Sequence, residues 1–108
     1  QIPFDIHLPY EKYYQSIIYM VCRLISDRVD AEVSSNVGEI DMVMELAEQV
    51  YIFEFKINQS VDAALKQIHE KKYYEKYLHL GKAIKLIGIE FSSKERNITG
   101  FKVEDYVF

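Results

Sequence analysis

Three charged residues stand in two otherwise apolar segments of the chain. Glu54 and Lys56 interrupt the apolar run 51–57, and Asp41 lies at the start of the apolar segment 40–46. Side chains two residues apart on a strand share a face, so Glu54 and Lys56 stand together, and Asp41 can join them if the strands pair. Two carboxylates on adjacent strands can hold a hard cation such as Mg²⁺, and a lysine beside them can orient or deprotonate a water. This pattern is typical of phosphodiester hydrolysis.

Each of these signals also has a commoner structural interpretation. A Glu-x-Lys tripeptide on a strand usually forms a solvated sheet face with a cross-strand ion pair. An aspartate that follows a glycine at a strand start, as Asp41 follows Gly38, is most often a turn residue. The order of the residues and their placement on consecutive strands favour the chemical interpretation.

The hydrophobic pattern predicts the elements that would position these side chains. An apolar stripe with steps of three and four residues predicts a first helix over residues 10–26. Five strands are expected, over residues 29–35, 40–46, 50–57, 83–91 and 98–103. Because the links between the first three strands are short, they should form an antiparallel meander.

A second helix is expected between the third and fourth strands. Asn58 or Ser60 would cap its start. Its apolar stripe loses phase near Lys71 and Lys72, which predicts a bend or break before a helical segment that Gly81 ends. The predicted order is therefore α-β-β-β-α-β-β around one sheet.

Composition bounds the function without identifying it. The 108 residues suffice for one domain, and the formal net charge of −4 argues against non-specific DNA affinity without excluding a local site. One cysteine, Cys22, cannot form an internal disulfide, and no apolar run is long enough to span a membrane. We therefore expect a cytoplasmic location. Because the chain begins with Gln1 rather than Met, we also expect it to be part of a longer polypeptide.

Several short segments carry a resemblance to a known family. Gly38-Glu39-Ile40-Asp41, Ile52-Phe53-Glu54-Phe55-Lys56 and Ala64-Leu65-Lys66-Gln67-Ile68 resemble the PD-(D/E)xK nuclease superfamily. They are most similar to the branch attached to AAA-type ATPase-like proteins of anaerobic bacteria, and the segment 86–93 resembles that branch too. The resemblance runs from the first helix to Val103 and implies a restriction-endonuclease-like α/β core, with a mixed central sheet flanked by helices.

The resemblance also implies roles for individual residues. Asp41 and Glu54 would be catalytic residues that bind the metal, and Lys56 would be the catalytic lysine. The main-chain carbonyl of Phe55 would lie near the metal. Ile40 takes the place of the motif proline, a departure that many members share.

Three further residues are assigned through the same resemblance. Gln67 matches a glutamine that many relatives carry on the helix after the motif, and we expect it to orient the substrate. The related exonuclease pattern has a tyrosine four residues later, where this chain has Lys71, so Tyr74 is the proposed substitute, two helical turns after Gln67. Glu11 corresponds to a first-helix glutamate that assists the metal, although a glutamate in a first turn is more often a surface residue.

Two other groups of polar residues give weaker signals. The histidines His7, His69 and His79 show no paired metal-ligand spacing. Lys71, Lys72 and Lys76 are expected on a solvated face, with contact to phosphates as the alternative.

The expected function is Mg²⁺- or Mn²⁺-dependent hydrolysis of DNA by a single nuclease domain over residues 1–108, the C-terminal part of a longer ATPase-linked protein. Its expected partners are DNA, the ATPase-like region of the same polypeptide and a second copy of the chain. The main alternative is an inactive nuclease-like module that binds nucleic acid or protein. A third possibility is a plain interaction domain whose charges coat the sheet. The sequence leaves DNA strandedness, specificity and internal or terminal cleavage open.

Overall fold

The computed structural model describes residues 10–108, with side chains from residue 12 onward. Its elements are α1 (Tyr10–Arg23), β1 (Val29–Ser35), β2 (Gly38–Glu45), β3 (Gln49–Ile57), α2 (Val61–Lys71), the 3₁₀ helix η1 (Tyr73–Leu80), β4 (Ala83–Ser92) and β5 (Asn97–Asp105). This confirms the predicted order and the restriction-endonuclease-like arrangement of a mixed sheet with helices. Among the described residues, no helix has both the length and the apolar character needed to cross a membrane.

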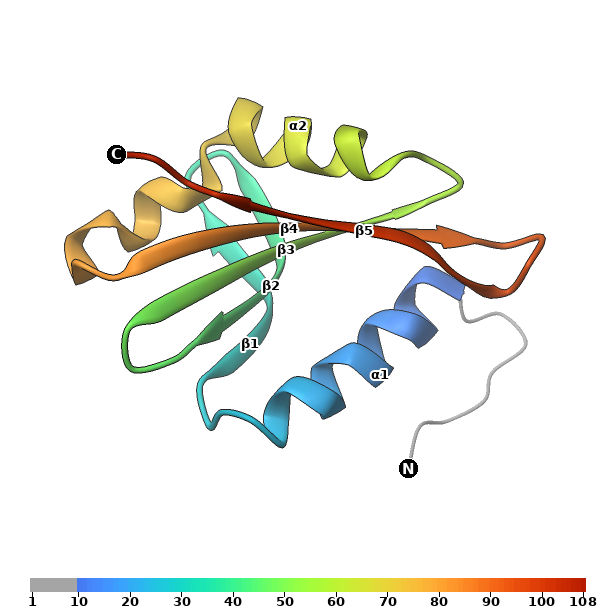
Figure 1. The fold of residues 1–108 in the computed structure, drawn as a ribbon, viewed down its shortest axis with the longest axis horizontal. Helices are drawn as coiled ribbons and strands as arrows, with labels where there is room; N and C mark the ends of the chain where they lie inside the picture. The colour runs from blue at the N-terminus through green and yellow to red at the C-terminus, as the bar shows by residue number, and fades with distance from the viewer. Residues whose placement is uncertain (1–9) are drawn as a thin grey trace.

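The five strands form one sheet in the order β1-β2-β3-β4-β5. β1, β2 and β3 pair antiparallel through short turns, as expected from the short links. β4 returns parallel to β3 after the helical crossover, and β5 pairs antiparallel with β4. Figure 1 shows α1 on one face of the sheet and α2 on the other.

Each face of the sheet has its own apolar core. On the α2 face, the buried residues are Ile40, Val43, Val50, Ile52, Leu65, Ile68, Tyr73, Ile84 and Leu86. On the α1 face they are Cys22, Val29, Met42, Met44, Phe53, Phe55, Ile89 and Phe91. Alternate residues of β3 therefore serve opposite cores, because successive side chains on a strand point to opposite faces.

The first helix is shorter than predicted and buries a narrower stripe. It ends at Arg23, and Tyr14, Ile18 and Cys22 face the sheet at four-residue spacing. Leu24 and Ile25, which the periodicity assigned to the helix, lie beyond its end and are 88% and 61% exposed. Periodicity alone shows which residues share a stripe but not where the sheet beneath that stripe ends.

The predicted break between the two helical segments is confirmed. The Ser60 hydroxyl caps α2 by accepting a hydrogen bond from the Ala63 amide. Lys72 then adopts a left-handed conformation, with φ 51° and ψ 44°, which stops the α-helix and starts η1 in a new direction. Gly81 ends η1 with φ 67°, as expected for a glycine cap.

α2 lies very close to the sheet where it crosses β4. A Cβ atom added to Gly88 would be 2.8 Å from the main-chain oxygen of Val61 and 3.1 Å from the Cβ of Ala64. Gly88 is the β4 partner of Glu54 on β3. The missing side chain at this position therefore allows α2 to pack closely on β4, beside the strand that carries the motif.

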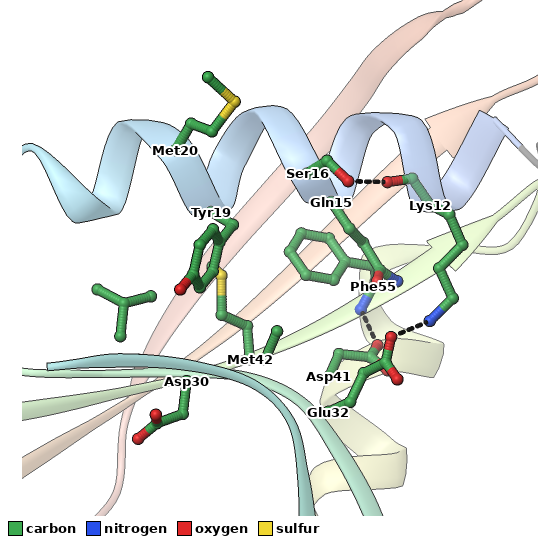
Figure 2. Close-up of a pocket in the computed structure, with 12 residues that line it drawn as sticks. Lys12, Gln15, Ser16, Tyr19, Met20, Asp30, Glu32, Asp41, Met42 and Phe55 are labelled. Atoms are coloured by element: carbon green, nitrogen blue, oxygen red, sulfur yellow. Dashed lines mark hydrogen bonds and ion pairs between the residues drawn. The ribbon is translucent and has the colours of Figure 1, made fainter. Parts of the chain in front are cut away.

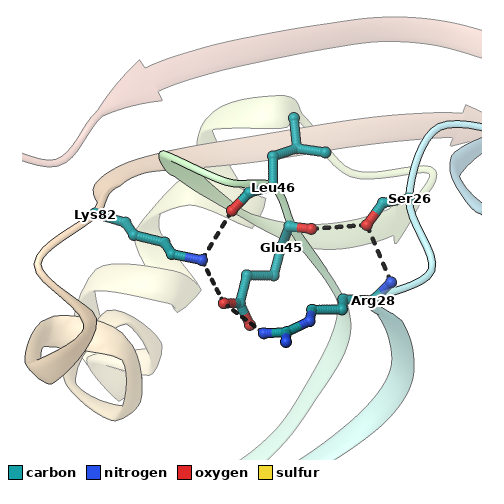
Figure 3. A network of polar contacts seen from close by, with 5 residues as sticks. All are labelled: Ser26, Arg28, Glu45, Leu46 and Lys82. Carbon is teal, nitrogen blue, oxygen red and sulfur yellow. Dashed lines mark hydrogen bonds and ion pairs between the residues drawn. The ribbon is translucent and has the colours of Figure 1, made fainter.

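At the end of the sheet away from the motif residues, a polar network joins three connecting segments (Figure 3). Oε2 of Glu45 accepts hydrogen bonds from Nζ of Lys82 at 2.5 Å and Nη1 of Arg28 at 3.3 Å. Lys82 also donates to the carbonyl of Leu46, and the Ser26 hydroxyl donates to the carbonyl of Glu45. The hydrogen bond from Lys82 is the main reason that the pKa of Glu45 is lowered.

The Glu45→Gln variant should therefore lose stability in a pH-dependent way. At neutral pH, we expect it to lower the free energy of unfolding by about 1 kcal/mol, because a charge-assisted hydrogen bond is lost. A lowered folded-state pKa stabilises the fold above the unfolded pKa, and this stabilisation disappears as pH falls through the folded pKa. Urea unfolding at several pH values would measure it. Asp62→Asn, which removes an exposed ion pair with Lys102 and one charge from the first turn of α2, is the control. A Glu45→Gln difference that does not change with pH would contradict the prediction.

Candidate active site

The strands β2 and β3 separate at the predicted aspartate. Their pairing runs as far as Met42 opposite Phe53 and, if continued in the same register, would place Asp41 opposite Glu54. Instead, Oδ2 of Asp41 accepts a hydrogen bond from the main-chain amide of Phe55 at 2.8 Å. The Asp41 carboxylate thus takes the place of a main-chain hydrogen-bond acceptor. We call the region where the two strands separate the β2–β3 fork (residues 40–42 and 53–56).

Glu54 and Lys56 share one face of β3, as the strand period predicted. Both follow Val50 and Ile52 on the α2 face. Glu54 is 3% exposed, and its Oε2 lies 3.8 Å from Nζ of Lys56. A buried carboxylate and a partly exposed ammonium therefore lie at the mouth of the fork.

The structure brings Asp41 into direct contact with Glu54. The two carboxyl groups are close enough for each to affect the charge of the other. Burial raises the pKa of Asp41, and this effect is opposed by the Phe55 amide, by Glu54 and by the charges of Lys12 and Lys56. Two acidic groups in a desolvated site, with cations beside them, form the kind of arrangement that a divalent cation can bridge.

A chain of hydrogen bonds continues from Lys56 into the helical layer. Nζ of Lys56 donates to Oε1 of Gln67, and Nε2 of Gln67 donates to the Tyr73 hydroxyl at 3.2 Å. Gln67 therefore lies where the resemblance predicted. Tyr74 does not share its helical face, because α2 ends before it, and its ring stacks on Tyr106 at 4.1 Å between centroids. The tyrosine that contacts Gln67 is Tyr73.

On the other face, a cavity of about 520 Å³ opens between α1 and the strands β1 and β2. Figure 2 shows Asp41 at one end of it, beneath Lys12. Nζ of Lys12 forms an ion pair with Glu32 at 3.0 Å. Glu32 has a positive φ of 53°, and the β1–β2 pairing is interrupted at this residue, opposite Asp41. Asp41 is therefore accessible from the cavity on the α1 face, and it also contacts Glu54, which lies on the α2 face.

Lys12 and Tyr73 are site residues that the motif comparison missed. Lys12 lies in a polar stripe of α1 with Gln15, Ser16 and Tyr19, all of which line the cavity. Their three- and four-residue spacing is visible in the sequence beside the apolar stripe. Glu11, the predicted metal assistant, lies in the first turn of α1, but its side chain is outside the described residues, so that role stays a prediction.

The donor set at the fork fits a small hard cation. Asp41 and Glu54 offer carboxylate oxygens, and Mg²⁺ is usually bound through one or two carboxylates while waters and substrate phosphates complete its shell. Oxygen ligands of this kind suit Mg²⁺ or Mn²⁺ better than ions that prefer nitrogen or sulfur. Within the part of the chain that the structure describes, no group of three or more His, Cys, Asp and Glu residues could hold a metal.

Comparisons with known proteins agree with this geometry. A family model described as "PD-(D/E)XK nuclease superfamily" matches residues 9–101. A protein of Azotobacter chroococcum mcd 1, described as an "Uncharacterized protein in vnfD 5'region", is 39% identical over 97 residues, or 88% of this chain. The chain spans only 19% of that relative's length.

One solved structure also shows a slight likeness. The pilotin EpsS of the Vibrio vulnificus type 2 secretion system has a TM-score of 0.36 and 11% identity, over 87% of this chain and 89% of its own. A TM-score this low supports no argument about fold or function. The predicted ATPase-associated branch is not tested by these matches and stays a prediction. The family model and the relative together show that this chain belongs to the PD-(D/E)XK nuclease superfamily.

Proposed function

We propose that this chain is the catalytic domain of a metal-dependent nuclease that hydrolyses phosphodiester bonds in DNA. The observation that supports this proposal most directly is the convergence of Asp41, Glu54 and Lys56 at the β2–β3 fork. Asp41 comes from β2 and the other two residues come from β3. The two acids lie in contact, and Nζ of Lys56 lies 3.8 Å from Oε2 of Glu54. A solvated sheet face would not bury Glu54 to 3% exposure.

The roles of the residues follow from their chemistry. Asp41 and Glu54 would hold the cation, which when bound supplies Lewis-acid activation of the phosphate and of a water. In the reaction, a water oxygen bonds to phosphorus while one ester oxygen leaves with the electrons of its broken bond. The proton that the water loses balances the one that the leaving oxygen gains. Lys56 would orient the water and offset the charge that builds on the phosphate.

Gln67 would act as a positioning residue for the lysine. Its amide oxygen accepts a hydrogen bond from Lys56, and its amide nitrogen is anchored on Tyr73. A long, flexible lysine side chain loses less rotational freedom during the reaction if it is already held in place. This contact supports a role for Gln67 at the reacting centre, in place of the more general substrate-orienting role that the resemblance implied.

The chain would act within a larger protein. In the Azotobacter relative, the matched region makes up about a fifth of the whole, which supports a longer polypeptide around this domain. The ATPase-like neighbour and the second copy that the resemblance implied stay predictions. An inactive module that only binds nucleic acid is the alternative, and the absence of metal-dependent cleavage by the intact protein would favour it.

The Asp41→Asn variant tests the metal site without a substrate. We expect Mg²⁺ or Mn²⁺ to raise the melting temperature of the parent protein, since a ligand that binds only the native state stabilises it. The substitution should remove that rise. The new amide can still accept from the Phe55 amide and can donate to Glu54, so the metal-free variant should be more stable than the parent by about 1 kcal/mol.

Calorimetric metal titration and thermal melts would measure both effects. Asp30→Asn is a matched control, because Asp30 is an exposed aspartate that lines the α1 cavity without entering the fork. It should leave the metal response unchanged. A metal response of Asp41→Asn equal to that of the parent would remove the basis for the proposed site.

A further inference from the structure

A second cavity, of about 460 Å³, lies on the far side of Tyr73 from the fork. It is lined by residues 34–37, which are the end of β1 and the turn that leads to β2, and by five residues between 71 and 76 at the junction of α2 and η1. Figure 1 shows this hairpin beside the end of α2. We call this cavity the junction pocket.

The junction pocket is positively charged on a chain that is acidic as a whole. Three lysines, Lys71, Lys72 and Lys76, line it together with one acid, Glu75. Nζ of Lys76 donates to the carbonyl of Ser34 at 2.8 Å and ties η1 to the hairpin. Within residues 10–108, the ammonium groups of Lys71 and Lys72 make no hydrogen bond or ion pair, and both side chains are exposed. The pocket therefore presents uncompensated positive charge.

Two hydrogen-bonded side chains, Tyr73 and Gln67, connect the junction pocket to the catalytic lysine. Tyr73 lines the pocket, while its hydroxyl accepts the hydrogen bond from Gln67 that leads back to Lys56. A Cβ atom added to Gly38, at the start of β2, would lie 3.5 Å from the same hydroxyl. The junction pocket and the fork are therefore neighbouring features joined by one chain of side-chain contacts.

The conformation of Lys72 adds a second observation. Its φ of 51° is a region where glycine is favoured and where a side chain is sterically unfavourable. A glycine would end α2 equally well, so helix termination does not explain the lysine. In this conformation Lys72 lies between α2 and η1 and lines the junction pocket.

We propose that the junction pocket binds a backbone phosphate of the DNA strand next to the phosphate that is cut. This inference rests on the proposed nuclease function and adds to it a substrate-positioning site. Lysines bind phosphates as mobile point charges, and such contacts position a protein on DNA without reading its sequence. They would also give this acidic chain the local affinity for DNA that its overall charge does not provide.

The Lys72→Gly variant tests the proposal because it removes the charge from a position where glycine is favoured. It should melt no lower than the parent, so weaker binding cannot be attributed to unfolding. Affinity of the intact protein for a labelled DNA duplex, measured by fluorescence anisotropy without divalent metal, should fall about five- to tenfold. The slope of log K against log salt should become shallower by about 0.9, the value for one lost phosphate contact. Lys71→Gln should act in the same way.

Arg96→Gly is the matched control. Arg96 is also a basic residue with positive φ, 53°, but it lies in the turn between β4 and β5 and does not line the junction pocket. It should leave the salt slope unchanged. If Lys72→Gly keeps the parent's slope while the parent binds and cuts DNA, or if Arg96→Gly reduces the slope equally, the junction pocket proposal is wrong and the nuclease function stands. If the parent neither binds nor cuts DNA, both proposals fail.

Discussion

Replacing Lys56 with alanine should reduce metal-dependent DNA cleavage by about 10²–10⁴-fold while leaving metal affinity nearly unchanged. The reason is the proposed division of roles at the fork, where Asp41 and Glu54 would hold the cation and the lysine would act on the water and the developing charge. Such a loss corresponds to about 3–5 kcal/mol of transition-state stabilisation. The measurement is single-turnover cleavage by the intact protein, with calorimetric metal titration in parallel.

Lys85→Ala provides the matched control for this experiment. Lys85 is another strand lysine paired with a carboxylate, in this case Asp105, which is its partner on the neighbouring strand β5. Its loss should change stability little, because exposed ion pairs are worth little, and should not affect cleavage. If the Lys56→Ala protein cuts DNA as fast as the parent, the role given to the lysine is wrong, even if the metal site is real.

The Gly88→Ala variant should be markedly less stable than the parent. The new methyl group would lie 2.8 Å from the main-chain oxygen of Val61, and a main-chain atom cannot rotate away as a flexible side chain can. Overpacking of this kind costs about 1–3 kcal/mol of unfolding free energy. Because Gly88 pairs with Glu54 and α2 carries Gln67, we also expect slower cleavage, through displacement of the helix from the site.

Gly100→Ala separates this steric effect from the general effect of removing a glycine. Its new methyl group would meet neighbouring atoms no closer than 3.5 Å, an ordinary contact distance. We expect a change within about 0.5 kcal/mol in urea unfolding. Equal stabilities for the two variants would mean that α2 can move away from β4 at little cost.

Much of the fold was predictable because its signals are local. The strand positions, the Ser60 cap, the helix break at Lys72 and the glycine stop at Gly81 all follow from the types of neighbouring residues. The shared face of Glu54 and Lys56 follows from the two-residue period of a strand. Each of these features depends on a few consecutive residues.

The features that were missed depend on distant parts of the chain. The β2–β3 fork depends on where the pairing of β2 with both of its neighbours is interrupted, and the positive φ of Glu32 opposite Asp41 has no signature in sequence. Tyr74 was expected on the same face as Gln67 because the helical count was continued through a break that redirects the chain. The exposed end of α1 reflects how far the sheet extends beneath it, which no helical pattern records.

The hydrogen bond that closes the fork also provides a spectroscopic probe. The amide of Phe55 donates directly to Oδ2 of Asp41 and belongs to a residue that is 1% exposed. Its nitrogen and proton resonances will therefore respond to any change in the charge or orientation of that carboxylate. In an isotopically labelled sample, this one amide signal can report metal binding, or a substitution at Glu54 or Lys12, without a nucleic-acid substrate and before any turnover is detected.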